Sequence, residues 1–332
     1  MSGLVRKDFM SDQAIRWCPG CGDYSILAQL QTAMATIGKP QHEHAVISGI
    51  GCSSRLPYYM ATYGFHTIHG RAPAVATGLK LANPDLSVWV ITGDGDALSI
   101  GGNHLAHVLR RNVDLNILLF NNRIYGLTKG QYSPTSELGK RTKSSPMGVV
   151  DAPMNPAAFA LGSNASYVAR SVDLLAKHLR KTLVDADGHA GTSFVEILQN
   201  CNIFNDKAFA AYTDKTARPE RILYLEAGEP LMWGEQTRHG LRQRGLGLEV
   251  FEIEGPEDEA ACLRHDPTDR NLAWALATLD APDAPLILGV LFAEERHTYE
   301  GDVQAQILDA QGGLEAADIH RLLQTPDSFK MR

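Results

Sequence analysis

Short apolar runs alternate with amphipathic segments over the first two hundred residues of the chain. The segment that follows Asp23 repeats apolar residues at helical spacing and ends before Gly38, which predicts a helix. Further helices are expected over 55–64, 72–83, 102–111 and 172–185. Apolar runs of strand length predict buried strands within 45–52, 86–93, 115–122 and 193–200, with a weaker candidate at 65–70.

This alternation is typical of a parallel sheet that carries helices on both faces. We therefore predict an α/β fold, with a doubly wound and mostly parallel sheet. Ligands bind such sheets outside the carboxyl ends of the strands. Glycine-rich or polar clusters occur at these ends, namely GIGCSSR, IHGRA, GDGD, NNRIYG and NCNIFN. Their positions predict a functional site at this edge of the sheet.

The pattern changes after Cys201, and PLILGVLFA predicts one more strand from Pro285. We expect three parts in the chain. These are an N-terminal segment with a C-x-x-C pair (1–22), a ligand-binding domain (23–210) and a C-terminal extension (211–332).

The spacing of two motifs predicts that Asp94 and Asn122 are neighbours. Gly93 and Gly95 flank Asp94 at a strand end, and 25 residues separate Gly95 from the pair Asn121–Asn122. A helix of about twelve residues rises ~18 Å and a strand of six advances ~20 Å, so the chain returns to the same edge. A carboxylate and an amide oxygen there suit Mg²⁺, and the glycines allow backbone N–H groups to approach a diphosphate. The alternative is an ordinary strand turn beside an Asx-rich loop.

Composition restricts the class of partner. The 332 residues are 44% hydrophobic and 21% charged, with a net charge of −7, which argues against nucleic acid. No apolar run is long enough to span a membrane and the N-terminus lacks a secretory pattern, so we expect a cytoplasmic protein. The loop 129–145 is an exception in charge. Its lysines and arginine predict either a solvated loop or a basic rim that attracts an anionic ligand or acidic partner.

Five cysteines in a chain of this length do not suggest a disulfide framework. Cys18 and Cys21 form a C-x-x-C pair, and Cys52 and Cys201 each follow a predicted strand at the functional edge. Taken alone, such residues suit a redox dithiol, a zinc site or an iron–sulfur cluster. Cys262 lies at helical spacing in EDEAACLRHD and is expected to be an ordinary buried residue.

Several motifs together resemble one enzyme family. The GDG followed by NN is similar to the diphosphate motif of thiamine diphosphate enzymes. The longer series WCPGCGDY, GIGCSSR, HTIHGRAPAVATGLKLANPDL, GDGDALSIGGNH and NNRIYGLTKGQYSPT resembles the β subunit of 2-oxoacid:ferredoxin oxidoreductases, over roughly residues 12–210. The resemblance implies a thiamine diphosphate domain with Mg²⁺ on Asp94, the Asn122 side chain and the Ile124 carbonyl. It implies a diphosphate on the turn Gly93, Asp94, Gly95 and Asp96.

The same resemblance implies that Cys18, Cys21, Cys52 and Cys201 hold a [4Fe–4S] cluster, with structural zinc as the alternative. The function it implies is the coenzyme A-dependent oxidative decarboxylation of 2-oxoglutarate to succinyl-CoA and CO₂, or the reverse, with electrons passed to ferredoxin. Pyruvate or a broad range of 2-oxoacids is the first alternative. A non-oxidative thiamine enzyme with a zinc site, or a zinc-stabilised binding module without catalysis, are the others.

Three residues are weaker candidates for substrate contacts. Arg55 is expected to bind the second carboxylate of 2-oxoglutarate or to form a structural ion pair. His69 is expected to face the cofactor or the substrate carboxylate, and Leu127 to form a wall of the substrate pocket. The glutamate that activates thiamine has no supported candidate, since no motif favours Glu43 or Glu196. The resemblance therefore implies a separate α subunit, in an αβ heterodimer or a dimer of αβ, without which the chain is inactive.

Overall fold

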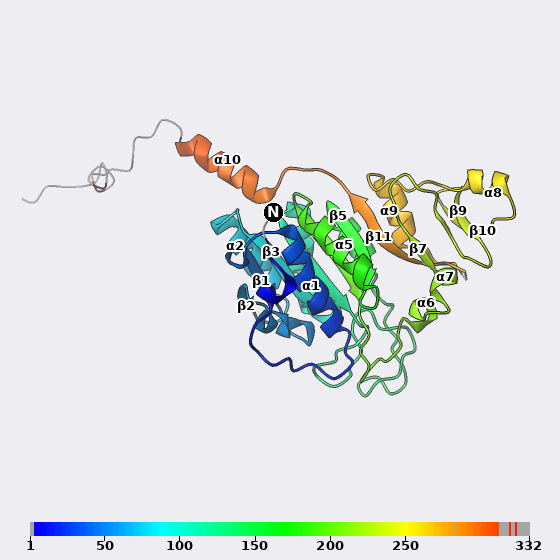
Figure 1. The fold of residues 1–332 in the computed structure, drawn as a ribbon, viewed down its shortest axis with the longest axis horizontal. Coiled ribbons are helices and arrows are strands. Elements are labelled where there is room, and N and C mark those ends of the chain that lie inside the picture. Colours follow the sequence, from blue (N-terminus) through cyan, green and yellow to red (C-terminus); the bar gives the residue numbers. More distant parts are fainter. Residues whose placement is uncertain (1–2, 282, 312–318, 320–322, 324–332) are drawn as a thin grey trace, which may run out of the picture.

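A computed structural model describes residues 3–281, 283–311, 319 and 323. Its centre is an eight-stranded sheet with the order β2-β1-β3-β4-β6-β5-β11-β7 (Figure 1). The strands of this sheet are β1 (His44–Ser48), β2 (Tyr63–His66), β3 (Ser87–Gly93), β4 (Leu115–Asn121), β5 (Tyr167–Val172), β6 (Thr192–Leu198), β7 (Ile222–Tyr224) and β11 (Leu286–Ala293). A second, three-stranded sheet contains β8 (Met232–Trp233), β9 (His239–Arg244) and β10 (Gly247–Glu252).

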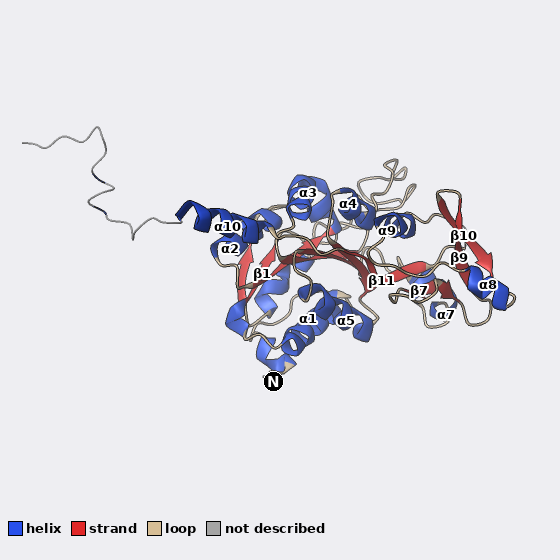
Figure 2. Ribbon diagram, turned by 90° about the horizontal axis from the view of Figure 1, so that it is seen from above, coloured by secondary structure: helices blue, strands red, loops and turns tan. Residues whose placement is uncertain are grey.

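Each adjacent pair from β2 across the sheet to β5 is parallel. Strand β11 is antiparallel to β5 and parallel to β7. Helices α1 and α5 lie on one face, and α2, α3, α4 and α9 lie on the other (Figure 2). The helices are α1 (Asp23–Ile37), α2 (Ala72–Ala82), α3 (Gly102–Arg111), α4 (Pro156–Gly162), α5 (Ala176–Asp187), α6 (Ala210–Thr213), α7 (Arg218–Arg221), α8 (Pro256–Ala261), α9 (Arg270–Ala277) and α10 (Tyr299–Gln311). The predicted fold class is confirmed.

One expected helix is wrong. The segment predicted as helical over 55–64 forms a 3₁₀ helix, Ser53–Tyr59, and then enters β2. Pro57 lies inside this segment, and a proline in a helix interior removes a backbone donor and clashes with the preceding turn. The strand β5 was also not expected, because Arg170 interrupts its apolar run.

Apolar side chains fill the space between the sheet and each helical layer. On one face Leu105 of α3 packs in the same cluster as Phe194 of β6. On the other face Ile26 and Leu30 of α1 pack in a cluster with Trp89 of β3. These side chains are fully buried. The two layers hold β1, β3, β4 and β6 parallel, so the loops after these strands meet at one edge of the sheet.

The C-terminal extension is continuous with the main sheet, because β7 and β11 are its last two strands. The predicted boundaries of the three parts remain a prediction, and most of 312–332 lies outside the described residues. Among the residues that the structure describes, no helix has the length and apolar character needed to cross a membrane.

Gly289 tests how the extension joins the sheet. Its φ of +117° is a conformation that L side chains rarely adopt, and a β-carbon there would lie 3.0 Å from Leu225 Cβ. We expect Gly289→Ala to lower the free energy of unfolding by about 2 kcal/mol in urea denaturation, since it adds backbone strain and a steric contact. Gly247→Ala in β10 is the matched control, because its β-carbon would meet nothing closer than 3.9 Å. Equal stability of the two variants would contradict this packing of β11.

Candidate functional site

The loops that follow β1, β3 and β4 enclose a pocket of about 110 Å³, here called the Asp94 pocket. Its walls include all the residues predicted to hold Mg²⁺ and the diphosphate. The buried Ser53 hydroxyl also lines it and has no hydrogen-bond partner among the described residues. Buried polar atoms normally have partners, so the pocket fits a polar ligand. The predicted residues in its wall are Gly93, Asp94, Gly95, Asp96, Asn122 and Ile124.

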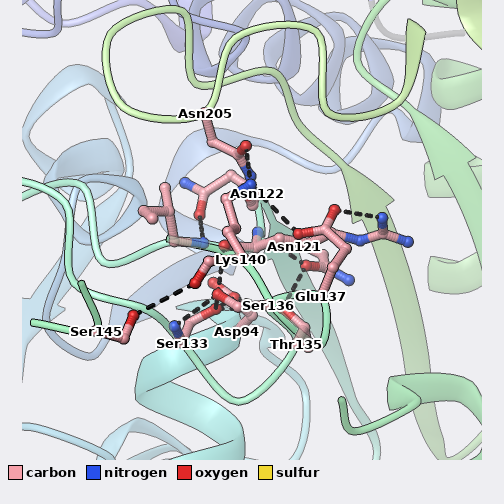
Figure 3. A network of polar contacts seen from close by, with 12 residues as sticks. Asp94, Asn121, Asn122, Ser133, Thr135, Ser136, Glu137, Lys140, Ser145 and Asn205 are labelled. Carbon is pink, nitrogen blue, oxygen red and sulfur yellow. Dashed lines mark hydrogen bonds and ion pairs between the residues drawn. The ribbon is translucent and has the colours of Figure 1, made fainter. Parts of the chain in front are cut away.

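Asp94 carries a buried carboxylate at the end of β3. Its Oδ2 accepts hydrogen bonds from Ser133 Oγ at 2.5 Å and Thr135 Oγ1 at 2.6 Å (Figure 3). Burial raises the pKa of Asp94 to about 6, although these two donors lower it. A divalent cation beside the carboxylate would offset the cost of burying its charge. The side chain therefore fits the role of a metal ligand.

The amide of Asn122 is fixed in orientation at the end of β4. Its Nδ2 donates to Gln199 Oε1 at 2.9 Å, and its Oδ1 accepts from the Ile124 N–H at 3.1 Å. The oxygen keeps a second lone pair for a cation. Arg123 between them has a φ of +56°, and this left-handed residue turns the backbone at the pocket. The predicted neighbours Asp94 and Asn122 do line one pocket.

Gly95 leaves room for a close approach to the turn. A β-carbon at this residue would lie 2.1 Å from Tyr125 Cε1, and the Tyr125 hydroxyl donates to the Gly95 carbonyl at 3.0 Å. A side chain here would displace the Tyr125 ring. The motif glycine is therefore required by the packing of the Tyr125 ring against this turn.

The Asp96 carboxylate is engaged by the protein itself. Oδ1 accepts from the N–H groups of Ile50 at 3.1 Å and Gly70 at 2.8 Å, and Oδ2 accepts from Thr92 Oγ1 at 2.7 Å. His69 Nδ1 lies 2.6 Å from Oδ1. Asp96 thus joins three loops. Because its carboxylate is already bonded, only its backbone could bind a diphosphate.

The three weaker candidates lie in different places. His69 lines the Asp94 pocket, and its contact with Asp96 orients the imidazole ring. Arg55 lines a neighbouring cavity instead, where its Nε donates to Tyr59 Oη at 3.0 Å. Leu127 is exposed and lines both spaces.

That neighbouring space, here called the cysteine cavity, has a volume of about 250 Å³. All four predicted cysteines line it as free thiols, Cys18, Cys21, Cys52 and Cys201. Within the described part of the chain, no three cysteine, histidine or acidic side chains already stand at metal-binding distance from one another. Cys262 lies elsewhere, and its Sγ donates to the Asp258 carbonyl at 3.4 Å.

Burial makes the thiolate forms of Cys21 and Cys52 unfavourable without a cation. It raises the pKa of Cys52 to about 12 and that of Cys21 further, and Asp23 and the neighbouring thiols add to both effects. A positively charged metal centre would reverse this, because it is the thiolate that binds metal. The cavity therefore fits a group that needs four thiolates.

The two spaces share a wall. Cys52, Asn122, Gly126 and Leu127 line both. A β-carbon on Gly126 would lie 3.5 Å from Cys52 Sγ and 3.7 Å from Cys201 Sγ, so the backbone there lies against both thiols. The predicted Mg²⁺ site and the predicted cluster site would thus lie on opposite sides of this wall.

The basic loop 129–145 is only partly a solvated loop. Lys140 is held by Glu137 and Asn205 (Figure 3). Arg141 and Lys143 are exposed and make no hydrogen bond or ion pair with any residue that the structure describes. They line an open hollow, here called the basic hollow, and Lys129, Ile203 and Phe204 line both this hollow and the cysteine cavity.

Sequence reasoning missed the side chains that support the predicted ligands. Ser133 and Thr135 belong to the quoted motif string, but nothing in the spacing indicated that their hydroxyls bind Asp94. Glu196 is held by Arg170 Nε at 2.7 Å and Asn121 Nδ2 at 2.8 Å. It lines a larger cavity of about 470 Å³, which contains none of the predicted site residues.

Comparison with known proteins shows which family the chain resembles. Residues 49–197 match the family model of the thiamine pyrophosphate enzyme, C-terminal TPP binding domain. A solved structure of 2-oxoglutarate:ferredoxin oxidoreductase from Magnetococcus marinus, with 2-oxoglutarate, coenzyme A and succinyl-CoA bound, is 35% identical. It aligns with a TM-score of 0.78 over 97% of this chain and 96% of that one.

Two curated relatives agree. The 2-oxoglutarate oxidoreductase subunit KorB of Mycobacterium tuberculosis is 49% identical over 97% of this chain and 87% of its own length. The 2-oxoacid:ferredoxin oxidoreductase subunit beta of Saccharolobus solfataricus is 44% identical over 76% of this chain and 88% of its own. The family and the oxidoreductase class predicted from the sequence are confirmed. The chain belongs to the family of 2-oxoacid:ferredoxin oxidoreductase β subunits.

Proposed function

We propose that this chain is the β subunit of a cytoplasmic 2-oxoglutarate:ferredoxin oxidoreductase. With an α subunit, the enzyme converts 2-oxoglutarate and coenzyme A to succinyl-CoA and CO₂, or runs in reverse. The observation that carries the proposal is the shared wall between the Asp94 pocket and the cysteine cavity. The names of the Mycobacterium relative and of the Magnetococcus structure support 2-oxoglutarate as the substrate. The broader name of the Saccharolobus relative favours a range of 2-oxoacids as the second candidate.

The Asp94 pocket would hold thiamine diphosphate and Mg²⁺. Asp94, the Asn122 amide oxygen and the Ile124 carbonyl would bind the metal, and the backbone of the turn from Gly93 to Asp96 would bind the diphosphate. Thiamine diphosphate, when bound, supplies the chemistry of 2-oxoacid decarboxylation. The chain contributes oxygen ligands of fixed orientation, as the bonds of Asn122 and Asp94 indicate.

Three side chains would act on the substrate side. The contact with Asp96 holds the His69 ring at the pocket, where we propose that it orients the cofactor or the substrate carboxylate. Leu127 would form a wall of the substrate pocket. The guanidinium of Arg55 would bind the distal carboxylate of 2-oxoglutarate from the adjoining cavity.

The cysteine cavity would hold a [4Fe–4S] cluster on Cys18, Cys21, Cys52 and Cys201. Such a cluster, when bound, transfers single electrons between the thiamine site and ferredoxin. Structural zinc would bind the same thiolates but could not transfer electrons across the shared wall. We propose that the α subunit supplies the thiamine-activating glutamate and that the isolated chain is inactive. Glu196 is not that glutamate, because Arg170 and Asn121 already bind its carboxylate.

The cluster is tested by metal and sulfide analysis of the anoxically purified enzyme. We expect about four irons and four labile sulfides per chain. Each of C18S, C21S, C52S and C201S should lose them, because four thiolates hold the cluster. Cys262→Ser is the matched control and should keep the full content. One zinc per chain without sulfide would overturn the redox part of the proposal.

Asp94→Asn tests the metal ligand. The substitution keeps the shape and the hydroxyl contacts but removes the charge, so Mg²⁺-dependent binding of thiamine diphosphate should weaken about 100-fold in calorimetry. Asp85→Asn, at an exposed aspartate outside the pocket, should bind as the unchanged enzyme does. Unchanged affinity in Asp94→Asn would exclude this carboxylate as a ligand.

The basic hollow beside the cysteine cavity is where we propose that ferredoxin docks. Ferredoxins are acidic, and Arg141 and Lys143 are exposed cations without partners among the described residues. We expect R141E with K143E to raise the KM for ferredoxin about tenfold, with a weaker dependence on salt, and to leave turnover with methyl viologen unchanged. The matched control is K7E with K177E, a double charge reversal at two exposed lysines that line neither the cysteine cavity nor the basic hollow. An unchanged KM for ferredoxin would place its docking site elsewhere.

A further inference from the structure

The turn Ser133–Ser136, in the loop between β4 and α4, is built from buried hydroxyl groups. Ser133, Thr135 and Ser136 are 2%, 3% and 1% exposed. Buried hydroxyls require hydrogen-bond partners, and here the partners lie on both arms of the proposed metal site (Figure 3). None of these three residues is among the proposed ligands.

One side of the turn holds the Asp94 carboxylate. Ser133 Oγ and Thr135 Oγ1 both bond to Oδ2, at 2.5 and 2.6 Å. Thr135 Oγ1 also lies 3.0 Å from Asn121 Oδ1, but a hydroxyl has one proton and the carboxylate is the nearer and charged acceptor. Asn121 Oδ1 has its own donor, the Arg123 N–H at 3.2 Å. Both hydroxyls therefore donate to Asp94 Oδ2, and neither donates to Asp94 Oδ1.

The other side of the turn holds the backbone after β4. Ser136 Oγ donates to the Arg123 carbonyl at 2.7 Å, and the Ser133 N–H donates to Ser136 Oγ at 2.9 Å. Arg123 is the left-handed residue between the proposed ligands Asn122 and Ile124. The turn thus connects the strand end that carries Asp94 with the strand end that carries the other two ligands.

The turn rests on a buried ion pair of the sheet. The Arg123 residue that Ser136 holds donates its N–H to Asn121 Oδ1 at 3.2 Å. Asn121 Nδ2 donates to Glu196 Oε1 at 2.8 Å, and Glu196 Oε2 accepts from Arg170 Nε at 2.7 Å. These side chains come from β4, β6 and β5. Because Glu196 is 2% exposed and bonded on both oxygens, this base is rigid.

We propose that the turn Ser133–Ser136 positions the metal of the bound cofactor. Its hydroxyls turn the Asp94 carboxylate so that Oδ1 faces the cation, and Ser136 holds the Asn122–Ile124 backbone at a fixed separation from it. Ser133, Thr135 and Ser136 are positioning residues that do not touch the metal. The inference rests on the proposed function, since it names what orients the Mg²⁺ ligands of that site.

The test measures Mg²⁺ affinity by calorimetry on the anoxically purified αβ enzyme in the presence of thiamine diphosphate. Thr135→Val removes the hydroxyl and keeps the shape, and changes to residues that support metal ligands typically weaken affinity 10–100-fold. We expect a Kd for Mg²⁺ at least about tenfold higher, with kcat near that of the unchanged enzyme at saturating Mg²⁺. Thr135→Ser keeps the hydroxyl and should bind within about threefold. Ser133→Ala is the second variant.

A buried threonine away from the site controls for stability. Thr182→Val removes a hydroxyl that donates to the His178 carbonyl within α5, and it should leave the Kd for Mg²⁺ unchanged. Equal Mg²⁺ affinity of Thr135→Val and the unchanged enzyme would overturn the inference, as would an equally weak Thr135→Ser. Absence of Mg²⁺ binding in the unchanged enzyme would instead overturn the proposed function, and this inference with it.

Discussion

The functional edge of the sheet depends on the hydrogen bonds of one buried carboxylate, that of Asp96. It binds backbone N–H groups of the loops after β1 and β2 and the Thr92 hydroxyl of β3, and it orients His69. A parallel sheet brings the carboxyl ends of its strands to one edge but does not fix the loops that follow them. Asp96 fixes three of these loops relative to one another. The Asp94 pocket has a defined shape for this reason.

The chain buries anionic groups on both sides of the shared wall. Burial raises the pKa of Asp94 on one side and of Cys21 and Cys52 on the other. The anionic form of each group is therefore less stable in the protein alone than in water, and a bound cation or metal cluster would stabilise it. Cofactor binding and stability are thus coupled in the proposed enzyme. Because Cys52 and Asn122 line both spaces, the two coupled sites are also neighbours.

The sequence predicts the parts of this arrangement that follow from periodicity and spacing. Apolar runs predict the strands β1, β3, β4 and β6. The lengths of the helix and strand between Asp94 and Asn122 predict that the two residues meet at one edge of the sheet. Strand β5 was missed because Arg170 looks like an exposed residue, whereas Glu196 on the neighbouring strand binds it. Other features depend on contacts between segments that are distant in the sequence, and no local pattern predicts them. They are the pairing of β11 with β5, the hydroxyl contacts of Ser133 and Thr135, and the position of Arg55.

Electron transfer across the shared wall is the central claim, and the most direct measurement is an electron paramagnetic resonance spectrum. The anoxic αβ enzyme would be mixed with 2-oxoglutarate, without ferredoxin or coenzyme A, and frozen. The account predicts the paramagnetic signal of a reduced [4Fe–4S] cluster that appears only when 2-oxoglutarate is added. A cluster that dithionite reduces but 2-oxoglutarate leaves silent would contradict the account.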